Sequence, residues 1–288
     1  MAAVPVVSVL NMKGGVGKTT ITAHVFRHMM TVLGKSILII DFDPQFNLTQ
    51  TLMTQTKYQR FRENNKTIFS VMEPPSAPSL FTISKKMGPP PLAEDIREQL
   101  FYWTATKKTA LGLIPGDFRM IKYTLVDDPK LLQPVQKRFI EFIEKSKEEY
   151  DLICIDCNPS SSFMTLCALN VSSHLLIPVR SDRYSILGLE LLDEFVNGLP
   201  SLINKPKQIV MINAAGGSAV DAEFESALRA NSKFGPITLP TVLKSSKLLG
   251  AKDGKVGFAT DKKLPHVNGI KQHLTKIVNE LKIPLGLS

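Results

Sequence analysis

A glycine-rich turn near the start of the chain constrains the fold more than any other feature. It follows an apolar run over residues 6–10 and precedes apolar residues at helical spacing that end at Gly34. Gly14, Gly15 and Gly17 let backbone N–H groups approach a phosphate chain closely. The following helix would point its positive end at the same phosphates. The turn therefore predicts a strand, a phosphate-binding loop and a helix in succession.

Short apolar runs alternate with amphipathic stretches along the rest of the chain. This alternation is typical of an α/β fold with a mainly parallel twisted sheet, flanked by helices on both faces. Strands are predicted at residues 6–10, 36–41, 111–115, 152–156, 174–179 and 208–213, with a weaker pattern at 237–242. Further helices are predicted at about 131–148, 162–170, 186–197, 221–231 and 269–281.

One stretch interrupts this rhythm. Residues 73–92 hold six prolines, so no regular element fits there. Because the sheet pattern resumes afterwards, we interpret residues 1–288 as a single domain with a proline-rich surface excursion at about 73–92.

Composition narrows the class of protein. No apolar run approaches the ~20 residues that a membrane span needs. The three cysteines lie close together in apolar sequence, which favours reduced, buried thiols in a cytosolic protein. The net charge of +9 favours a polyanionic partner, although charge alone does not separate nucleic acid from an acidic membrane or from plain solubility.

The loop also carries two lysines. Lys18 is placed to reach the β- and γ-phosphates of a nucleotide, and the Thr19 hydroxyl is placed to ligate Mg²⁺. The strict phosphate-loop pattern has glycine six residues before Lys18, where this chain has Met12; a second lysine, Lys13, follows. This combination resembles the deviant Walker A motif of the ParA/MinD ATPase superfamily. The predicted ATP-binding residues are Lys13, Gly14, Gly15, Val16, Gly17, Lys18, Thr19 and Thr20.

The resemblance implies a role for Lys13. In the family this signature lysine crosses a dimer interface and touches the phosphates of the partner's nucleotide. ATP would then hold two subunits together, and hydrolysis would release them. The alternative is that Lys13 serves its own subunit's nucleotide or solvent.

Two groups of carboxylates follow apolar strands. Asp41 and Asp43 would project at the carboxyl edge of the sheet, where open α/β sheets bind ligands. Their segment resembles the family's D-x-D-P-Q-x-N run, which assigns Asp43 to the attacking water and Asp41 to the Mg²⁺ shell; a turn-capping role for Asp41 stays open. Asp156 ends another strand as a Walker B aspartate and would hold Mg²⁺. Phe46 and Asn158 depart from the family pattern.

The resemblance covers nearly the whole chain, is strongest at residues 6–47 and weakest at 57–110, and favours the Soj-like ParA branch over MinD. It extends to the segments 113–116, 174–179 and 186–190. Asn213 closes a segment that, in the family, reads the adenine ring.

The same resemblance points to DNA. Residues 242–251 line up with a ParA stretch in which an arginine implicated in non-specific DNA binding falls on Lys244. Residues 244–263 hold six lysines and two aspartates, which suits contact with phosphates and not with base edges. The alternative is an ordinary solvated basic loop. The predicted DNA-binding residues are Lys244, Lys247, Lys252 and Lys255.

Three other patterns are interpreted as structural. His24 and His28 share a helix without a third metal ligand, and Cys154 and Cys157 lie within a strand instead of at a helix start. The apolar stripe of the last helix has only modest basic flanks, so we expect it to pack on the core and not to anchor a membrane.

Together these residues predict an ATP-dependent dimerising ATPase with ATP and Mg²⁺ as cofactors and Lys13, Lys18 and Asp43 as catalytic residues. It would bind DNA non-specifically, lie in the cytoplasm on the nucleoid when ATP-bound, and partition or position cargo. A ParB-like or cargo adaptor protein would stimulate hydrolysis. Alternatives are a MinD-like ATPase positioning cargo on a membrane or protein assembly, a nucleotide-dependent scaffold or regulator, and a small-molecule ligase or kinase.

Overall fold

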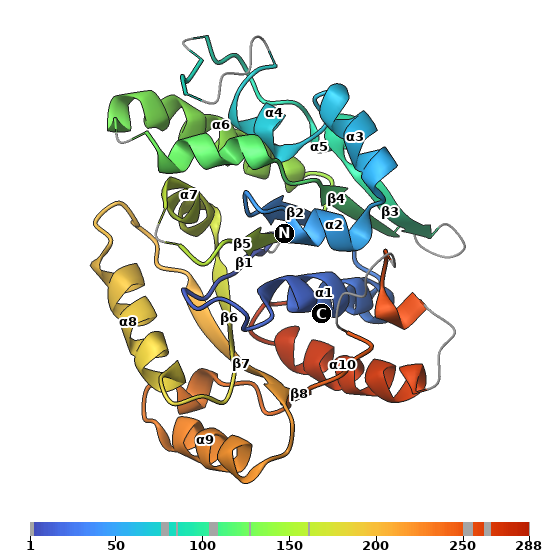
Figure 1. Cartoon of the computed structure of the whole chain (residues 1–288), viewed down its shortest axis with the longest axis vertical. Coiled ribbons are helices and arrows are strands. Elements are labelled where there is room, and N and C mark those ends of the chain that lie inside the picture. The colour runs from blue at the N-terminus through green and yellow to red at the C-terminus, as the bar shows by residue number, and fades with distance from the viewer. Residues whose placement is uncertain are drawn as a thin grey trace.

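Eight strands form one sheet in the computed structural model, in the order β3-β4-β2-β5-β1-β6-β7-β8 (Figure 1). The structure describes residues 3–75, 81–84, 86–103, 109–126, 128–160, 162–249, 256–261 and 266–287. Within these ranges every neighbouring pair is parallel except β3–β4. The strands are β1 (Val6–Val9), β2 (Ile37–Phe42), β3 (Glu98–Trp103), β4 (Thr109–Ile114), β5 (Leu152–Cys157), β6 (His174–Val179), β7 (Lys207–Ala215) and β8 (Leu243–Lys244).

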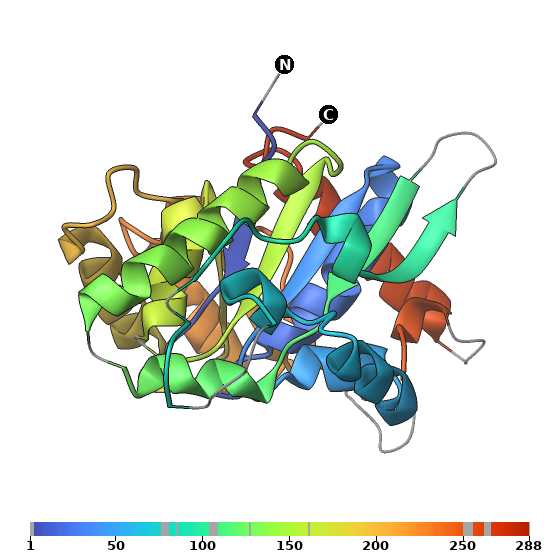
Figure 2. The same ribbon diagram turned by 90° about the horizontal axis from the view of Figure 1, so that it is seen from above.

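Helices cover both faces of this sheet, as predicted (Figure 2). On β2, Leu38, Ile40 and Phe42 join the core under α6 and α7, whereas Ile37 and Ile39 face α1 and α10. This period-two division buries both faces of a parallel sheet. The helices are α1 (Lys18–Leu33), α2 (Asn47–Leu52), α3 (Gln55–Glu63), α4 (Ile68–Met72), α5 (Ala93–Ile96), α6 (Pro129–Ser146), α7 (Phe163–Val171), α8 (Ser185–Gly198), α9 (Ala219–Ala230) and α10 (Val267–Leu281), with 3₁₀ turns at Phe118–Thr124, Gly235–Ile237 and Ala259–Asp261.

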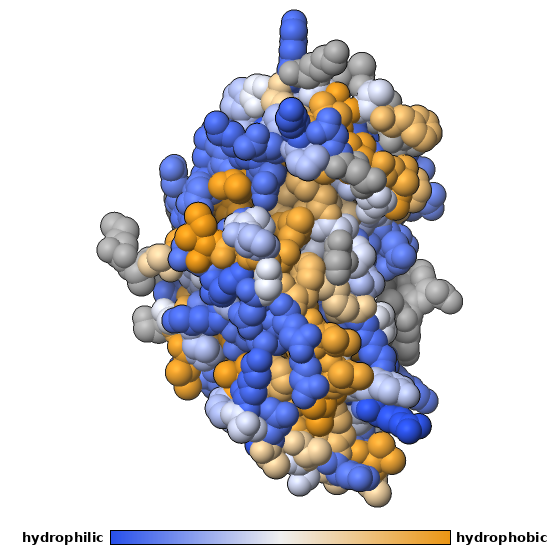
Figure 3. Space-filling model, turned by 90° about the vertical axis from the view of Figure 1, so that its left-hand side faces the viewer, coloured by the Kyte–Doolittle hydropathy of each residue, from blue (hydrophilic) through white to orange (hydrophobic). Residues whose placement is uncertain are grey.

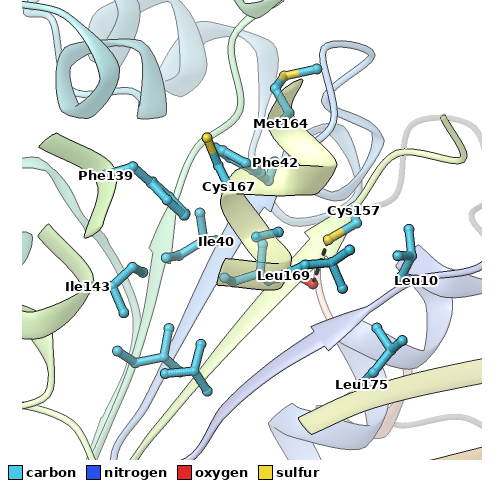
Figure 4. Packing of buried hydrophobic residues seen from close by; sticks show 14 of the residues in the cluster. Leu10, Ile40, Phe42, Phe139, Ile143, Cys157, Met164, Cys167, Leu169 and Leu175 are labelled. Atoms are coloured by element: carbon cyan, nitrogen blue, oxygen red, sulfur yellow. Dashed lines mark hydrogen bonds between the residues drawn. The ribbon is translucent and has the colours of Figure 1, made fainter. Parts of the chain in front are cut away.

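The core under α6 and α7 is closely packed (Figure 4). Phe42 of β2 stacks on Phe139 of α6, with ring centroids 4.5 Å apart. Cys167 of α7 lies in the same cluster. All three cysteines are buried and free, which agrees with the prediction of reduced thiols.

The predicted strand at 237–242 is wrong. Residues 235–237 form a 3₁₀ turn, Thr238 makes only an isolated bridge to Val210, and the strand β8 lies at Leu243–Lys244. Pro236 and Pro240 lack the N–H group that a ladder requires, which explains why the apolar pattern there does not become a strand.

The proline-rich stretch at 73–92 forms no helix or strand in its described parts, 73–75, 81–84 and 86–92, as predicted. It is nevertheless fixed in place. Arg138 of α6, only 4% exposed, donates hydrogen bonds to the carbonyls of Met87, Gly88 and Pro89. Glu73 pairs with the fully buried Lys122 at 2.6 Å and accepts the Ser84 amide at 2.8 Å. That the chain is a single domain stays a prediction.

The last helix packs on the first. The stripe of α10 that includes Leu274, Ile277 and Val278 is fully buried in the core with α1, as the sequence predicts. His28 bonds Thr275 of α10 at 2.8 Å, a structural contact. Among the described helices, none is long and apolar enough to cross a bilayer.

Candidate nucleotide site

The phosphate loop lies between β1 and α1, at the carboxyl edge of the sheet. Gly15 and Gly17 have φ angles of +73° and +93°, which L side chains rarely adopt. A Cβ at Gly17 would lie 2.1 Å from Nδ2 of Asn213. That nitrogen donates to the Val16 carbonyl at 2.7 Å, so Asn213 holds the loop from the end of β7. Its predicted adenine contact is untested.

Lys18 begins α1 and turns back into the loop. Its Nζ donates to the carbonyls of Asn11 at 3.0 Å and Lys13 at 3.2 Å, and the residue is 8% exposed. Burial lowers the pKa of this ammonium group, and the nearby Asp156 carboxylate opposes that effect. The cation is therefore held where an anionic ligand of the loop would meet it.

Lys13 occupies the exposed rim of the loop. Its Nζ lies 2.6 Å from Oδ2 of Asp182, and the two side chains are 48% and 31% exposed. The Lys13 amide donates to Oδ1 of Asn11 at 2.9 Å. Asp182 lies in the loop after β6, from which Arg180 also donates to the Gly15 carbonyl at 3.2 Å. The signature lysine is thus paired within its own subunit.

Asp41 and Asp156 lie directly opposite each other on the paired strands β2 and β5. Asp156 accepts the hydroxyls of Thr19 at 2.9 Å and Thr22 at 3.1 Å. Asp41 accepts both the hydroxyl and the amide of Thr49, at 2.6 and 2.8 Å. Burial, with repulsion from Asp41, raises the pKa of Asp156 to about 8, and burial, with repulsion from Asp43, raises that of Asp41 to about 7.

These carboxylates suit a shared divalent cation. Two buried, repelling carboxylates beside the Thr19 hydroxyl are stabilised by a positive charge. The described residues contain no cluster of three or more His, Cys, Asp or Glu side chains that could enclose a metal alone. Mg²⁺ takes only one or two carboxylates and completes its shell with water and substrate phosphates, so the donor set fits Mg²⁺ bound with a nucleotide.

Asp43 stands at the mouth of the site. It is partly buried, which raises its pKa, and its Oδ1 accepts the Gln45 amide at 2.9 Å. Phe46, the departure from the family pattern, adopts a left-handed conformation with φ 43°. Its ring stacks on Tyr58 of α3 at 5.0 Å, and a Cβ at Gly116 would lie 2.7 Å from the Cβ of Phe46. The aromatic pair therefore fixes the turn after Asp43.

A cleft of about 1150 Å³ opens in front of these groups. It is large enough for a nucleotide. The predicted residues Gly14, Gly15, Gly17, Lys18, Thr19, Thr20 and Asp43 line it, together with Phe46, Thr49 and Tyr58. Asp41 and Asp156 lie beneath, where Thr49 and Thr19 separate them from the opening.

Of the predicted DNA-binding lysines, Lys244 lies on the edge strand β8, which pairs with β7. Lys244 of β8 and Lys247 in the following turn are exposed. Lys252 and Lys255 lie outside the described residues. Leu249 and Val256, on either side of that gap, both line the nucleotide cleft.

Sequence reasoning missed several residues that build the site. Thr49 links Asp41 to the Gly116 amide, and Asp182 holds Lys13. Asn11 joins the loop to the Pro178 carbonyl of β6 at 2.8 Å. Of these residues, Thr22 could have been found from the sequence, because it lies three residues after Thr19, the predicted Mg²⁺ ligand, on α1. The others depend on contacts between segments far apart in the chain.

Comparison with known proteins assigns the chain to a family. The AAA domain family model matches residues 4–211. Sporulation initiation inhibitor protein Soj of Bacillus subtilis is 27% identical over 188 residues, which cover 65% of this chain and 62% of Soj. Cell division protein PomZ of Myxococcus xanthus is 25% identical over 279 residues, which cover 94% of this chain and 77% of PomZ.

Solved structures agree on the fold. The pNOB8 ParA structure has a TM-score of 0.67 at 20% identity and covers 98% of this chain and 97% of that one. A putative plasmid partition protein from Borrelia burgdorferi, bound to AMPPNP, has a TM-score of 0.66 at 16% identity, covering 96% and 98%. The phosphate loop, the paired aspartates and the family match together show that the chain belongs to the ParA/MinD family of P-loop ATPases.

Proposed function

We propose that this protein is an ATP-dependent dimerising switch ATPase that binds DNA non-specifically and partitions or positions a cargo. The observation that carries the proposal is the phosphate loop with two lysines: Lys18 turned into the loop and Lys13 exposed on its rim. From this half-exposed rim position Lys13 could also reach a nucleotide bound to another subunit.

ATP would lie along the loop from Lys13 to Thr20, with its phosphates on the loop amides and the start of α1. Thr19 and Asp156, with Asp41 behind them, would hold Mg²⁺. When bound, this cation neutralises charge on the phosphate oxygens. Two neighbouring structures support the cofactors: the Borrelia protein bound to AMPPNP, and a cobyrinic acid a,c-diamide synthase from Mycobacterium smegmatis bound to ADP and magnesium.

Hydrolysis needs in-line placement of water and neutralisation of charge. Lys18 would stabilise the charge on the transferred phosphoryl group. Asp43 would accept a hydrogen bond from the attacking water, and its position is set by the Gln45 amide and the Phe46–Tyr58 stack. We expect basal turnover to be slow and open to stimulation by a partner.

Dimerisation would exchange one contact for another. In the single chain Lys13 pairs with Asp182. In the dimer it would leave that carboxylate and reach the phosphates bound to the other subunit, which offer a higher negative charge. Loss of the γ-phosphate would remove part of that attraction and let the dimer separate.

Lys244 and Lys247, with Lys252 and Lys255, would contact DNA phosphates. The exposure of Lys244 and Lys247 suits a sequence-independent contact. The structure of pNOB8 ParA bound to nonspecific DNA, with a TM-score of 0.63 at 20% identity, supports this assignment.

Similarity to the cell division protein PomZ keeps a cargo other than a plasmid within the proposal. The synthase of similar fold keeps a small-molecule ligase in view, but Lys13 and the lysines after β8 favour the switch. Co-sedimentation with DNA and with liposomes in the presence of ATP separates DNA from membrane as the surface.

Asp43→Ala tests the proposal. We expect the variant to bind ATP, to release little phosphate and to remain on DNA as a dimer, while Lys18→Ala neither binds ATP nor enters the DNA pellet. Phosphate release by Asp43→Ala at the wild-type rate would overturn the catalytic assignment. If the wild-type protein sedimented with DNA to the same extent with and without ATP, the proposed switch would be overturned.

A further inference from the structure

The turn after Asp43 contains a strained residue. Phe46 has φ 43° and ψ 39°, in the left-handed region that a bulky side chain rarely adopts. The other non-glycine residues with positive φ in the described part of the chain are Asn65 and His266, residue types that occur there more often. Strain of this kind persists only where the surrounding structure enforces it, and it concentrates at functional sites.

The backbone of Phe46 connects Asp43 to helix α2. Its amide donates to the Asp43 carbonyl at 2.8 Å, and its carbonyl accepts the Gln50 amide of α2 at 3.0 Å. Among the described residues, the Asp43 carboxylate accepts one hydrogen bond, from the Gln45 amide. The position of this carboxylate therefore depends mainly on the shape of the turn that Phe46 closes.

Two neighbours hold Phe46 in its left-handed conformation. Its ring stacks on Tyr58 of α3, with centroids 5.0 Å apart and ring planes 16° apart. The second neighbour is Gly116, where a Cβ would lie 2.7 Å from the Cβ of Phe46 and 2.9 Å from Cγ of Asp41. Gly116 thus leaves room for Phe46, and Tyr58 covers one face of its ring.

The Phe46–Tyr58 pair differs from apolar residues scattered over the surface. On the side that carries α8, hydrophobic and hydrophilic residues lie interspersed, which is ordinary for a protein surface (Figure 3). Both rings of the pair instead line the nucleotide cleft, together with Asp43. Helix α3, which supplies Tyr58, buries none of its side chains, so it contributes to the cleft more than to the core.

We propose that Phe46 and Tyr58 form an aromatic clamp that holds Asp43 where it orients the attacking water. The clamp sets the rate of hydrolysis, because a displacement of about 1 Å at a reacting centre can cost about 100-fold in rate. It leaves the affinity for ATP unchanged, because the loop amides and Lys18 stay in place. The inference rests on the proposed role of Asp43, through which both rings act as positioning residues. Phe46 departs from the family pattern, so the clamp is a feature of this chain.

Single-turnover hydrolysis of Mg-ATP by the full chain tests the clamp, and calorimetry with a non-hydrolysable ATP analogue measures affinity separately. Tyr58→Ala should lower the rate by about 10- to 100-fold and change the dissociation constant by less than about 2-fold. Tyr58→Phe keeps the stacked ring and should restore the rate.

Phe61→Ala is the matched control. Phe61 lies on the same helix and packs against the same core as Tyr58, but it is not among the described residues that line the cleft. In thermal unfolding it should lose stability as Tyr58→Ala does, yet it should keep the wild-type rate within about 2-fold. If Tyr58→Ala does not fold, Phe46→Ala carries the same prediction.

An Asp43→Ala background shows whether the clamp acts through this carboxylate. Adding Tyr58→Ala should lower the remaining rate by less than about 2-fold, because no carboxylate is left to position. A further loss of about 10-fold would overturn the clamp. So would a wild-type rate in Tyr58→Ala, an equal loss in Phe61→Ala, or weaker binding of the analogue that accounts for the slower rate. Wild-type hydrolysis by Asp43→Ala alone would instead contradict the proposed catalytic role, whereas a slow Asp43→Ala beside a fast Tyr58→Ala would remove only the clamp.

Discussion

Two irregular segments of this molecule are held by the same device, a buried cation on backbone carbonyls. In the phosphate loop, Lys18 donates to the carbonyls of Asn11 and Lys13. In the proline-rich segment, Arg138 donates to the carbonyls of Met87 and its two successors, and also to Val71 and Ser70.

The two cations differ in whether a ligand can reach them. Lys18 lines a cleft of about 1150 Å³, so an anion can enter and take the place of carbonyls that hold the ammonium group. Arg138 is 4% exposed, and its guanidinium is already saturated by carbonyls of the protein. We therefore expect the first cation to exchange partners with a ligand and the second only to stabilise the fold.

Arg138→Ala should give the largest effect. It leaves five carbonyls without this donor, those of Ser70 and Val71 in buried bonds, and we expect the free energy of unfolding to fall by about 3–5 kcal/mol, as when a buried charged partner is removed. Urea unfolding measures the loss, with the exposed Arg60→Ala on α3 as a control expected to change it by less than about 0.5 kcal/mol. Equal stability of the two variants would mean that Arg138 does not fix the proline-rich segment.

Lys18→Ala should weaken nucleotide binding without lowering the stability of the fold. Loss of charge-assisted bonds to phosphate should weaken ATP by about 100-fold or more, equivalent to roughly 3 kcal/mol. The free energy of unfolding should change little, because the lost bonds to loop carbonyls are offset by relief of the desolvated charge. Calorimetric titration and urea unfolding on the same sample check both halves. A large loss of stability would make Lys18 a structural cation like Arg138.

Asp182→Asn should give the smallest effect. The Lys13–Asp182 pair is about half exposed, so it is worth about 0.2–1 kcal/mol. Removing the charge frees Lys13 and should tighten the ATP-dependent dimer by a few-fold in sedimentation velocity. Glu223→Gln, an exposed acid on α9, serves as the control. A weaker dimer in Asp182→Asn would show that this aspartate assists association instead of competing with it.

The contrast also explains what the sequence could predict. The phosphate loop, the parallel sheet and the aspartates at strand ends are local patterns, and each appears at the predicted place. Arg138 could not be assigned a role, because its acceptors lie about 50 and 70 residues away in the sequence. They are backbone carbonyls, which no residue type in the proline-rich stretch reveals. Asp182 was missed for the same reason: it follows β6, 169 residues after Lys13, and the two meet only when β6 pairs with β1.

Short or irregular elements were the other source of error. The edge strand β3 and the helices α2 to α5 were not predicted, since the longest of these spans nine residues and α3 buries none of its side chains. The strand at 237–242 was predicted from apolar residues alone, although Pro236 and Pro240 are unfavourable in a strand.

The central claim is that Lys13 turns a nucleotide-binding loop into a two-subunit switch. Multi-angle light scattering with a non-hydrolysable ATP analogue tests it most directly, on wild type, Lys13→Ala and the exposed control Lys66→Ala, after calorimetry has verified that each binds the nucleotide. We predict a dimer for wild type and Lys66→Ala, and a nucleotide-bound monomer for Lys13→Ala. A Lys13→Ala protein that dimerised as readily as wild type would contradict the account.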